Sequence, residues 1–142
     1  MPKLNTLYIE DDDAAYFLVQ TAIAEACVSV HLFRVSDGEQ AIEFLLKQGS
    51  YASAPEPDLI LLDLNLPRVH GFEVLSYVQN TESLRRIPVD ILTTSSARQD
   101  KERSLALGAR RFFTKPQSFD GLVALIRLIF RPIAETDSPN MS

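Results

Sequence analysis

The fold is decided by Leu59-Ile60-Leu61-Leu62-Asp63-Leu64-Asn65-Leu66-Pro67, in which four aliphatic residues lead directly into a carboxylate and a proline ends the apolar run. A continuous apolar run without alternation predicts a strand that is buried on both faces, as in a parallel sheet. Open α/β sheets place their ligands at the carboxyl ends of such strands. We therefore expect the Asp63 carboxylate to lie at the edge of a crevice while the core holds its backbone.

Strand and helix patterns alternate five times along the 142 residues. Strand patterns occupy 4–9, 30–35, 59–63, 89–92 and a short segment centred on 112–113. Helical patterns follow at 14–27, from 36–38 to 46, and at 71–79, 99–107 and 118–130. Because crossovers between parallel strands are right-handed, this order predicts an α/β fold with a doubly wound five-stranded parallel sheet and five helices. We expect a single domain, with an irregular loop at 49–57.

The composition narrows the classes of function. A formal net charge of −5 argues against a general nucleic-acid surface and against attraction to anionic membranes. The N-terminus lacks a signal-peptide pattern, and no apolar stretch reaches the roughly 18 residues of a membrane span. We therefore expect a cytoplasmic protein that binds neither nucleic acid nor a membrane. The single cysteine, Cys27, is expected to be a small core residue of its helix.

Polar residues of different kinds follow four of the five strand patterns: Glu10 with Asp11, then Asp63, Thr93 and Lys115. Because the carboxyl ends of parallel strands meet at one edge of a sheet, these side chains are expected to converge. Three neighbouring carboxylates repel one another and need a cation or protons, and a small set of oxygen ligands favours Mg²⁺. A hydroxyl and an ammonium suit a phosphoryl group, and an aspartate can attack phosphorus. The sequence therefore predicts a site for phosphoryl transfer.

The set Glu10-Asp11, Asp63, Thr93 and Lys115-Pro116 resembles the receiver domain of two-component response regulators. The intervals of 30 residues from Asp63 to Thr93 and of 22 from Thr93 to Lys115 match the usual spacing of that family. The resemblance covers about residues 4–130. It implies the flavodoxin-like strand order 2-1-3-4-5, for which a receiver is itself a standard example.

In three further features the sequence is similar to the small receivers that serve bacterial and cyanobacterial phytochromes. They are the long segment 49–57, the sequence Leu64-Asn65-Leu66-Pro67, and the absence of an attached output domain in the 142 residues. The resemblance therefore implies a phytochrome as one possible partner.

The receiver resemblance implies that Asp63 accepts a phosphoryl group from a histidine of a sensor kinase, with Mg²⁺ as cofactor. Asp11 would bind the metal ion directly and Glu10 mostly through water. Asp63 itself and the backbone carbonyl of Asn65 would complete the protein ligands. The chain would not be an enzyme beyond self-catalysed transfer and autodephosphorylation.

The same resemblance implies a conformational response that partner proteins read. Lys115 would pair with the phosphoacceptor carboxylate and then with the phosphoryl group. Thr93 would move toward a phosphoryl oxygen, and Phe112 would turn inward as the threonine moves. Asn65 and Ser95 would flank the path of the attacking water and tune dephosphorylation.

The last helical pattern, 118–130, is apolar nearly all round, which is typical of a helix buried on more than one side. Val123, Leu128 and Phe130 lie off its core stripe and are expected to form the face of a homodimer. Simple packing at the end of the chain is the alternative. Residues 131–142 are polar and are expected to be flexible or to lie at the dimer interface.

Other interpretations stay open. A pseudo-receiver would only bind partners, and a phosphate sink would accept phosphate without a conformational output. A phosphohydrolase would need Asp-x-Asp, whereas Asp63-Leu64-Asn65 ends in an amide that cannot transfer the proton. Helix capping alone would explain the acids at 11–13, and it is the expected role of Asp37. His31 and His70 are expected at the surface or in packing.

Overall fold

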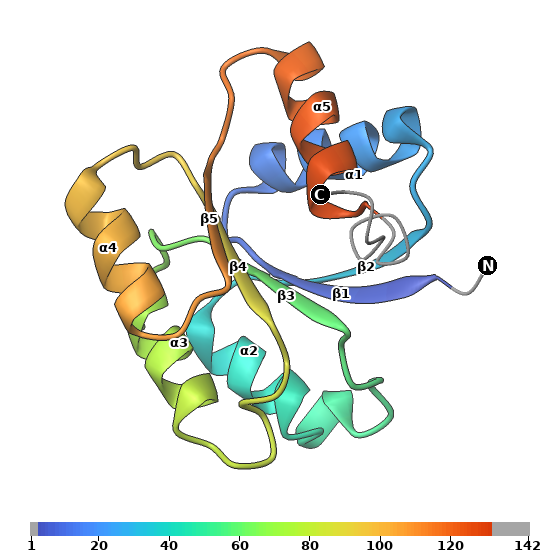
Figure 1. Cartoon of the computed structure of the whole chain (residues 1–142). Coiled ribbons are helices and arrows are strands. Elements are labelled where there is room, and N and C mark those ends of the chain that lie inside the picture. Colours follow the sequence, from blue (N-terminus) through green and yellow to red (C-terminus); the bar gives the residue numbers. More distant parts are fainter. Residues whose placement is uncertain (1–2, 132–142) are drawn as a thin grey trace, which may run out of the picture.

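The computed structural model describes residues 3–131 and has three layers (Figure 1). The strands are β1 (Leu4–Ile9), β2 (Val30–Val35), β3 (Leu59–Leu62), β4 (Val89–Thr93) and β5 (Arg111–Thr114). The helices are α1 (Asp13–Ala26), α2 (Gly38–Leu45), α3 (Gly71–Gln79), α4 (Arg98–Ala106) and α5 (Phe119–Ile129). All strands are parallel, in the order β2-β1-β3-β4-β5. α1 and α5 cover one face of the sheet, and α2, α3 and α4 cover the other.

The doubly wound fold and its strand order confirm the predictions from the sequence. The bounds of α1, α3, α4 and α5 agree with the predicted ones to within one residue at each end. Local signals explain this agreement. Asp12 caps α1 by accepting the Ala14 N–H at 2.9 Å, and Gly108 follows α4 with a φ of 108°, a conformation that favours glycine.

The sequence predicts an irregular loop at 49–57, but part of this segment is regular. Gly49–Tyr51 forms a turn of 3-10 helix, η1. The Tyr51 ring lies 5.4 Å from that of Phe44 in α2, and Phe44 lies 5.7 Å from Phe33 in β2. These aromatic contacts hold the segment against the edge of the sheet. The residues around Tyr51 are small or polar and show no helical spacing of apolar residues, so the sequence did not predict this turn.

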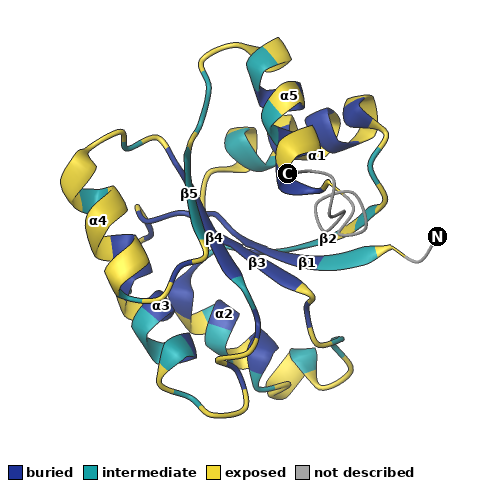
Figure 2. Cartoon of the chain, viewed as in Figure 1, coloured by how far each residue is buried: buried dark blue, intermediate teal, exposed yellow. Residues whose placement is uncertain are grey.

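The third strand is buried on both faces, as its aliphatic run predicted. Leu59 and Leu61 pack in the core beneath α1 and α5, while Ile60 and Leu62 pack beneath α2 and α3. None of the four is more than 2% exposed, and Figure 2 shows β3 within the buried centre of the molecule. Burial of each side chain contributes roughly 1.5–3 kcal/mol. A rigid strand therefore delivers the next residue, Asp63, to the edge of the sheet.

Two expectations about helix faces were wrong. Cys27 is exposed and ends α1 with a φ of 58°, so it is not a core residue. Val123 and Phe130 are 6% and 8% exposed, and of the predicted dimer face only Leu128, at 42%, is exposed. The reason is that α1 packs alongside α5, so this helix buries a flank in addition to the stripe that faces the sheet.

Of the predicted tail 131–142, only Arg131 belongs to the described residues, and it is exposed. The expectation for 132–142 therefore lies outside the part of the chain that the structure describes. Within residues 3–131, no helix combines the length and the apolar character needed to cross a membrane.

Candidate functional site

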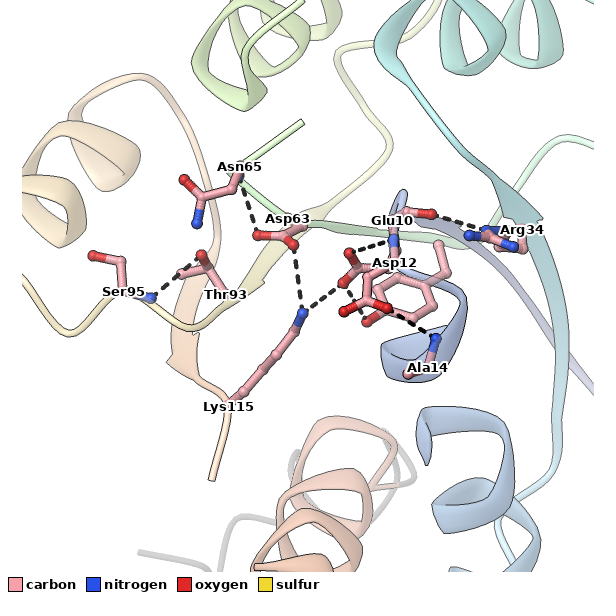
Figure 3. Close-up of polar contacts among 10 residues, drawn as sticks. Glu10, Asp12, Ala14, Arg34, Asp63, Asn65, Thr93, Ser95 and Lys115 are labelled. Carbon is pink, nitrogen blue, oxygen red and sulfur yellow. Dashed lines mark hydrogen bonds and ion pairs between the residues drawn. The ribbon is translucent and has the colours of Figure 1, made fainter. Parts of the chain in front are cut away.

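The carboxyl ends of four strands bring the candidate residues together at one edge of the sheet (Figure 3). Glu10 follows β1, Asp63 follows β3, Thr93 ends β4 and Lys115 follows β5. The backbone N–H of Lys115 donates to the Thr93 carbonyl at 2.7 Å, which holds the end of β5 against β4. The structure thus places side by side the groups that the sequence assigned to this edge.

Three carboxylates form the acidic part of the site. Glu10, Asp11 and Asp63 each offer an oxygen, and these atoms lie within 4.8 Å of one another. Glu10 and Asp63 are buried, whereas Asp11 is exposed. Burial raises the pKa of Glu10 above its usual range, the Asp63 charge adds to this effect, and Lys115 opposes it. A donor set made only of oxygen, with an open side at Asp11, fits a hard divalent cation.

Asp63 is held in one orientation by its neighbours. Its Oδ1 accepts the backbone N–H of Asn65 at 3.2 Å, and its Oδ2 lies 3.4 Å from the Lys115 Nζ. The following loop is pinned by α3, because a Cβ on Gly71 would lie 2.5 Å from the Leu64 Cα. Only glycine permits this close approach. The carboxylate is therefore fixed from its own loop, from β5 and from α3.

Lys115 is closer to Glu10 than to Asp63. Its Nζ donates to the Glu10 Oε1 at 2.5 Å, against 3.4 Å for the Asp63 Oδ2. The lysine side chain is 15% exposed, so both contacts are partly desolvated and stronger than surface ion pairs. The pairing with Asp63 implied by the resemblance is present, but the shorter contact to Glu10 was not foreseen.

A buried tyrosine beneath the site was also missed. The Tyr8 hydroxyl donates to the Glu10 Oε1 at 3.0 Å, and Tyr8 is fully buried. Burial, reinforced by Glu10, raises the pKa of Tyr8 far above its usual value, so the phenol stays protonated and acts as a donor. A signal existed in the sequence, because Tyr8 and Glu10 are two residues apart and alternate residues of a strand share a face.

Arg34 of the edge strand β2 supports the acidic loop from the side. Its Nε donates to the Glu10 backbone carbonyl at 2.8 Å, and its Nη1 lies 2.9 Å from Asp13. Its guanidinium also stacks 5.1 Å from the centre of the Tyr16 ring. Figure 3 shows this arginine on the side of Glu10 away from Asp63. Arg34 is therefore a support of the loop.

Thr93 and Ser95 link the site to its surroundings. Thr93 is fully buried, and its Oγ1 lies 3.4 Å from the Ser95 backbone nitrogen. The Ser95 hydroxyl donates to Asp100 of α4 at 2.6 Å, and the Ser95 carbonyl accepts the Thr114 hydroxyl of β5 at 2.8 Å. Phe112, the predicted aromatic switch, is half-buried against the core beneath α2 and α3. The loop after β4 is thus tied to both α4 and β5.

Several polar residues near this edge have structural roles. Asp12 and Asp37 cap α1 and α2, and Asp37 accepts the Gln40 N–H at 2.8 Å. The His70 Nδ1 accepts the Phe72 N–H at 3.1 Å and caps α3. The expected cap at Asp37 is therefore confirmed, and His70 is exposed, in agreement with the surface position expected for it.

Comparisons with known proteins agree with this geometry. A family model described as response regulator receiver domain matches residues 6–127. Response regulator Rcp1 from Synechocystis sp. is 38% identical over 126 residues, which cover 89% of this chain and 85% of that protein. The crystal structure of phosphorylated cyanobacterial phytochrome response regulator RcpA has a TM-score of 0.83 at 37% identity, covering 89% of this chain and 91% of the other. The Mn²⁺-bound form of Rcp1 has a TM-score of 0.84 at 37% identity, covering 96% and 98%.

Proposed function

This chain belongs to the response regulator receiver family, and from that premise we propose that Asp63 accepts a phosphoryl group from a histidine of a sensor kinase. The observation that carries the proposal is the buried Asp63 carboxylate beside Lys115, Thr93 and two further acids. An aspartate with no chemical role at the end of a strand would not need these neighbouring groups. A nucleophile for phosphoryl transfer needs positioning and compensation of charge, and these residues supply both.

In the proposed transfer, a carboxylate oxygen of Asp63 attacks the phosphorus of a phosphohistidine on the partner. A P–O bond forms and gives an acyl phosphate, while the bond between phosphorus and the imidazole nitrogen breaks and its electron pair returns to the imidazole. Lys115, now 3.4 Å from the Asp63 Oδ2, would compensate the charge of the phosphoryl oxygens. The Thr93 hydroxyl would donate a hydrogen bond to one of them.

The same proposal assigns Mg²⁺ to the acidic cluster. Glu10, Asp11 and Asp63 would hold it, together with the backbone carbonyl of Asn65. Bound there, the ion would neutralise the acids and the transferred phosphoryl oxygens. Mg²⁺ prefers a ligand set in which a few protein oxygens are combined with phosphate oxygens. A relative, Rcp1, has been crystallised in a Mn²⁺-bound form.

Phosphorylation would add about −1.5 to −2 charges at Asp63. We propose that Thr93 moves toward this charge and draws the loop after β4 with it. Because Ser95 is hydrogen-bonded to Asp100 and Thr114, the displacement would reach α4 and β5 together. Phe112 would then turn inward, and partner proteins would bind the altered surface of α4, β5 and α5.

We also propose a phytochrome-type sensor kinase as the partner that phosphorylates Asp63. RcpA is a cyanobacterial phytochrome response regulator, and this similarity supports a phytochrome-type kinase as the donor. A cytoplasmic location and signalling without nucleic acid remain predictions from the sequence. The predicted homodimer now rests on Leu128 alone, and sedimentation of phosphorylated and unphosphorylated protein tests it.

The test is to incubate the protein with Mg²⁺ and a small phosphodonor such as phosphoramidate and to measure its intact mass. Wild type is expected to gain one acid- and base-labile phosphoryl group, and Asp63→Asn none. Asp12→Asn is the matched control, because Asp12 only caps α1 and asparagine caps equally well. Phosphorylation of Asp63→Asn at the wild-type rate would exclude Asp63 as the acceptor.

A pseudo-receiver and a phosphate sink are separated by a second measurement. Amide NMR spectra with Mg²⁺ and beryllofluoride, a mimic of the phosphoryl group, should change from Asp63 through Thr93 to Phe112. A protein that forms the acyl phosphate without these changes is a sink. A protein that forms neither complex is a binding module only.

A further inference from the structure

Glu10 is a buried carboxylate with three donors. Its Oε1 accepts from the Lys115 Nζ at 2.5 Å and from the Tyr8 hydroxyl at 3.0 Å, and its Oε2 accepts the Asp12 backbone N–H at 3.2 Å. Glu10 is only 1% exposed, so bulk solvent has little access to the position of a donor that leaves. Under the proposed function Mg²⁺ would share the charge of Glu10, and the hydrogen bonds to Oε1 would still come from Lys115 and Tyr8. A buried charge that loses a donor is destabilised by the full cost of desolvation of the unpaired group.

Of the three donors, Lys115 is the one that also contacts Asp63. Under the proposed function it must leave the short contact with Glu10 and move toward the phosphoryl group on Asp63, which lies on its other side (Figure 3). The Glu10 oxygen that accepts from Lys115 is the same Oε1 that accepts from Tyr8. The phenol therefore serves the atom that the lysine vacates.

We propose that Tyr8 is a positioning residue that keeps Glu10 hydrogen-bonded and so releases Lys115 for the phosphoryl group on Asp63. Tyr8 is suited to this role because its ring is packed in the core: it is fully buried within β1, and its ring lies 6.5 Å from that of Tyr16. Within the described residues its hydroxyl has Glu10 as its partner. This inference rests on the proposed function but concerns a residue outside the predicted site.

Removal of the hydroxyl by Tyr8→Phe leaves the ring and the fit of the core in place. Glu10 then depends more strongly on Lys115, and the lysine is held back from Asp63. The apparent affinity for beryllofluoride at saturating Mg²⁺ is expected to fall roughly tenfold, the size of one hydrogen bond to a charged group. Side-chain NMR of the lysine ammonium should show Lys115 changing less on addition of beryllofluoride than in wild type.

Tyr16→Phe is the matched control, because it removes a neighbouring phenol hydroxyl whose partner is Gln20 on the same helix. A purely structural role for Tyr8 would lower thermal stability but leave the affinity and the Lys115 signal unchanged. That outcome would overturn the proposal. Failure of wild type itself to bind beryllofluoride would instead overturn the proposed function, so the two failures are distinguishable.

A measurement on wild type keeps the inference testable if Tyr8→Phe does not fold. The buried Tyr8 hydroxyl proton should exchange slowly with solvent, and it should stay hydrogen-bonded to Glu10 when beryllofluoride is bound. At the same time Lys115 should lose its contact with Glu10. A Tyr8 hydroxyl that becomes rapidly exchanging in the bound state would show that the phenol does not hold Glu10, and the proposal would fail.

Discussion

Asn65 and Ser95, the two residues predicted to tune dephosphorylation, differ in the hydrogen bonds that their side chains make. Asn65 is exposed, and its bond to Asp63 is made by its backbone N–H, so within residues 3–131 its side-chain amide has no hydrogen-bond partner and would be available to a water near the proposed phosphoryl group. Ser95 already uses its hydroxyl to bind Asp100. A substitution at Ser95 therefore changes the attachment of α4 as well as access to the site. A substitution at Asn65 leaves the attachment of α4 unchanged.

We therefore expect Asn65→Ala to lengthen the half-life of the acyl phosphate several-fold. The physical reason is that the attacking water loses a group that orients it, while the Asp63 carboxylate keeps its backbone donor. The measurement is the loss of the phosphoryl group with time after removal of the phosphodonor. A half-life equal to that of wild type, together with an unchanged amide spectrum, would contradict a role for this side chain.

Single residues also show where prediction from the sequence succeeds. Asp63, Thr93 and Lys115 end or follow strands of the sheet, and parallel strands bring such ends together at one edge. Tyr8 and Arg34 act from inside a strand and from the sheet edge, and their partners depend on side-chain direction and register. The spacing of Tyr8 and Glu10 places them on one face of a strand but does not reveal the hydrogen bond between them, and no spacing in the sequence indicates the contacts of Arg34.

Among the elements, β4 and β5 are joined by a buried charge at the end of the sheet away from the site. Asp90 in β4 is fully buried and pairs with Arg110 at 2.8 Å and Arg111 at 2.5 Å. Arg111 also donates to the Ile129 carbonyl at the end of α5, 3.1 Å away. The hydrogen bonds that Arg110 donates to Asp90 raise the pKa of Arg110. This cluster connects two strands and a helix that the proposed switch also involves.

Asp90→Asn is expected to lower the free energy of unfolding by about 1–3 kcal/mol, the cost of weakened hydrogen bonds between buried charged groups. The loss stays below that of a fully buried broken pair, because the arginines are 47% and 32% exposed and can be hydrated. Arg86→Ala, which breaks the exposed pair with Glu56, is the control and should cost no more than about 1 kcal/mol. Urea denaturation measures both, and equal effects would contradict the structural role of Asp90.

Element bounds were predictable to within a residue because caps are local, whereas helix faces were not. Val123 and Phe130 of α5 were assigned to an exposed face because helical spacing identifies one buried stripe only. The second buried flank exists because α1 packs alongside α5, and that neighbour is distant in sequence. The turn at Gly49–Tyr51 was missed for a similar reason, since the aromatic contact of Tyr51 with Phe44 holds it.

At the scale of the whole molecule, the first two turns of α1 and the start of α5, which follow site residues in the chain, carry exposed apolar side chains. Phe17 and Leu18 are 62% and 47% exposed, and Phe119 at the start of α5 is 38% exposed. We call these three residues the α1–α5 patch. Both helices start just beyond site residues, so we expect a protein that delivers a phosphohistidine to Asp63 to contact residues of this patch. Exposed apolar side chains beside a reaction site are typical of a protein interface.

Phe17→Ala is expected to lower kcat/KM for phosphotransfer from the partner kinase roughly tenfold, because loss of an aromatic anchor at an interface costs more than about 1 kcal/mol. Phosphorylation by phosphoramidate should be unchanged, since the small donor needs no docking surface. Leu105→Ala, at an exposed leucine of α4 on the other face of the sheet, is the matched control. Equal loss with kinase and phosphoramidate would mean that Phe17 supports the fold of the site, and no loss with either would place the kinase elsewhere on the surface.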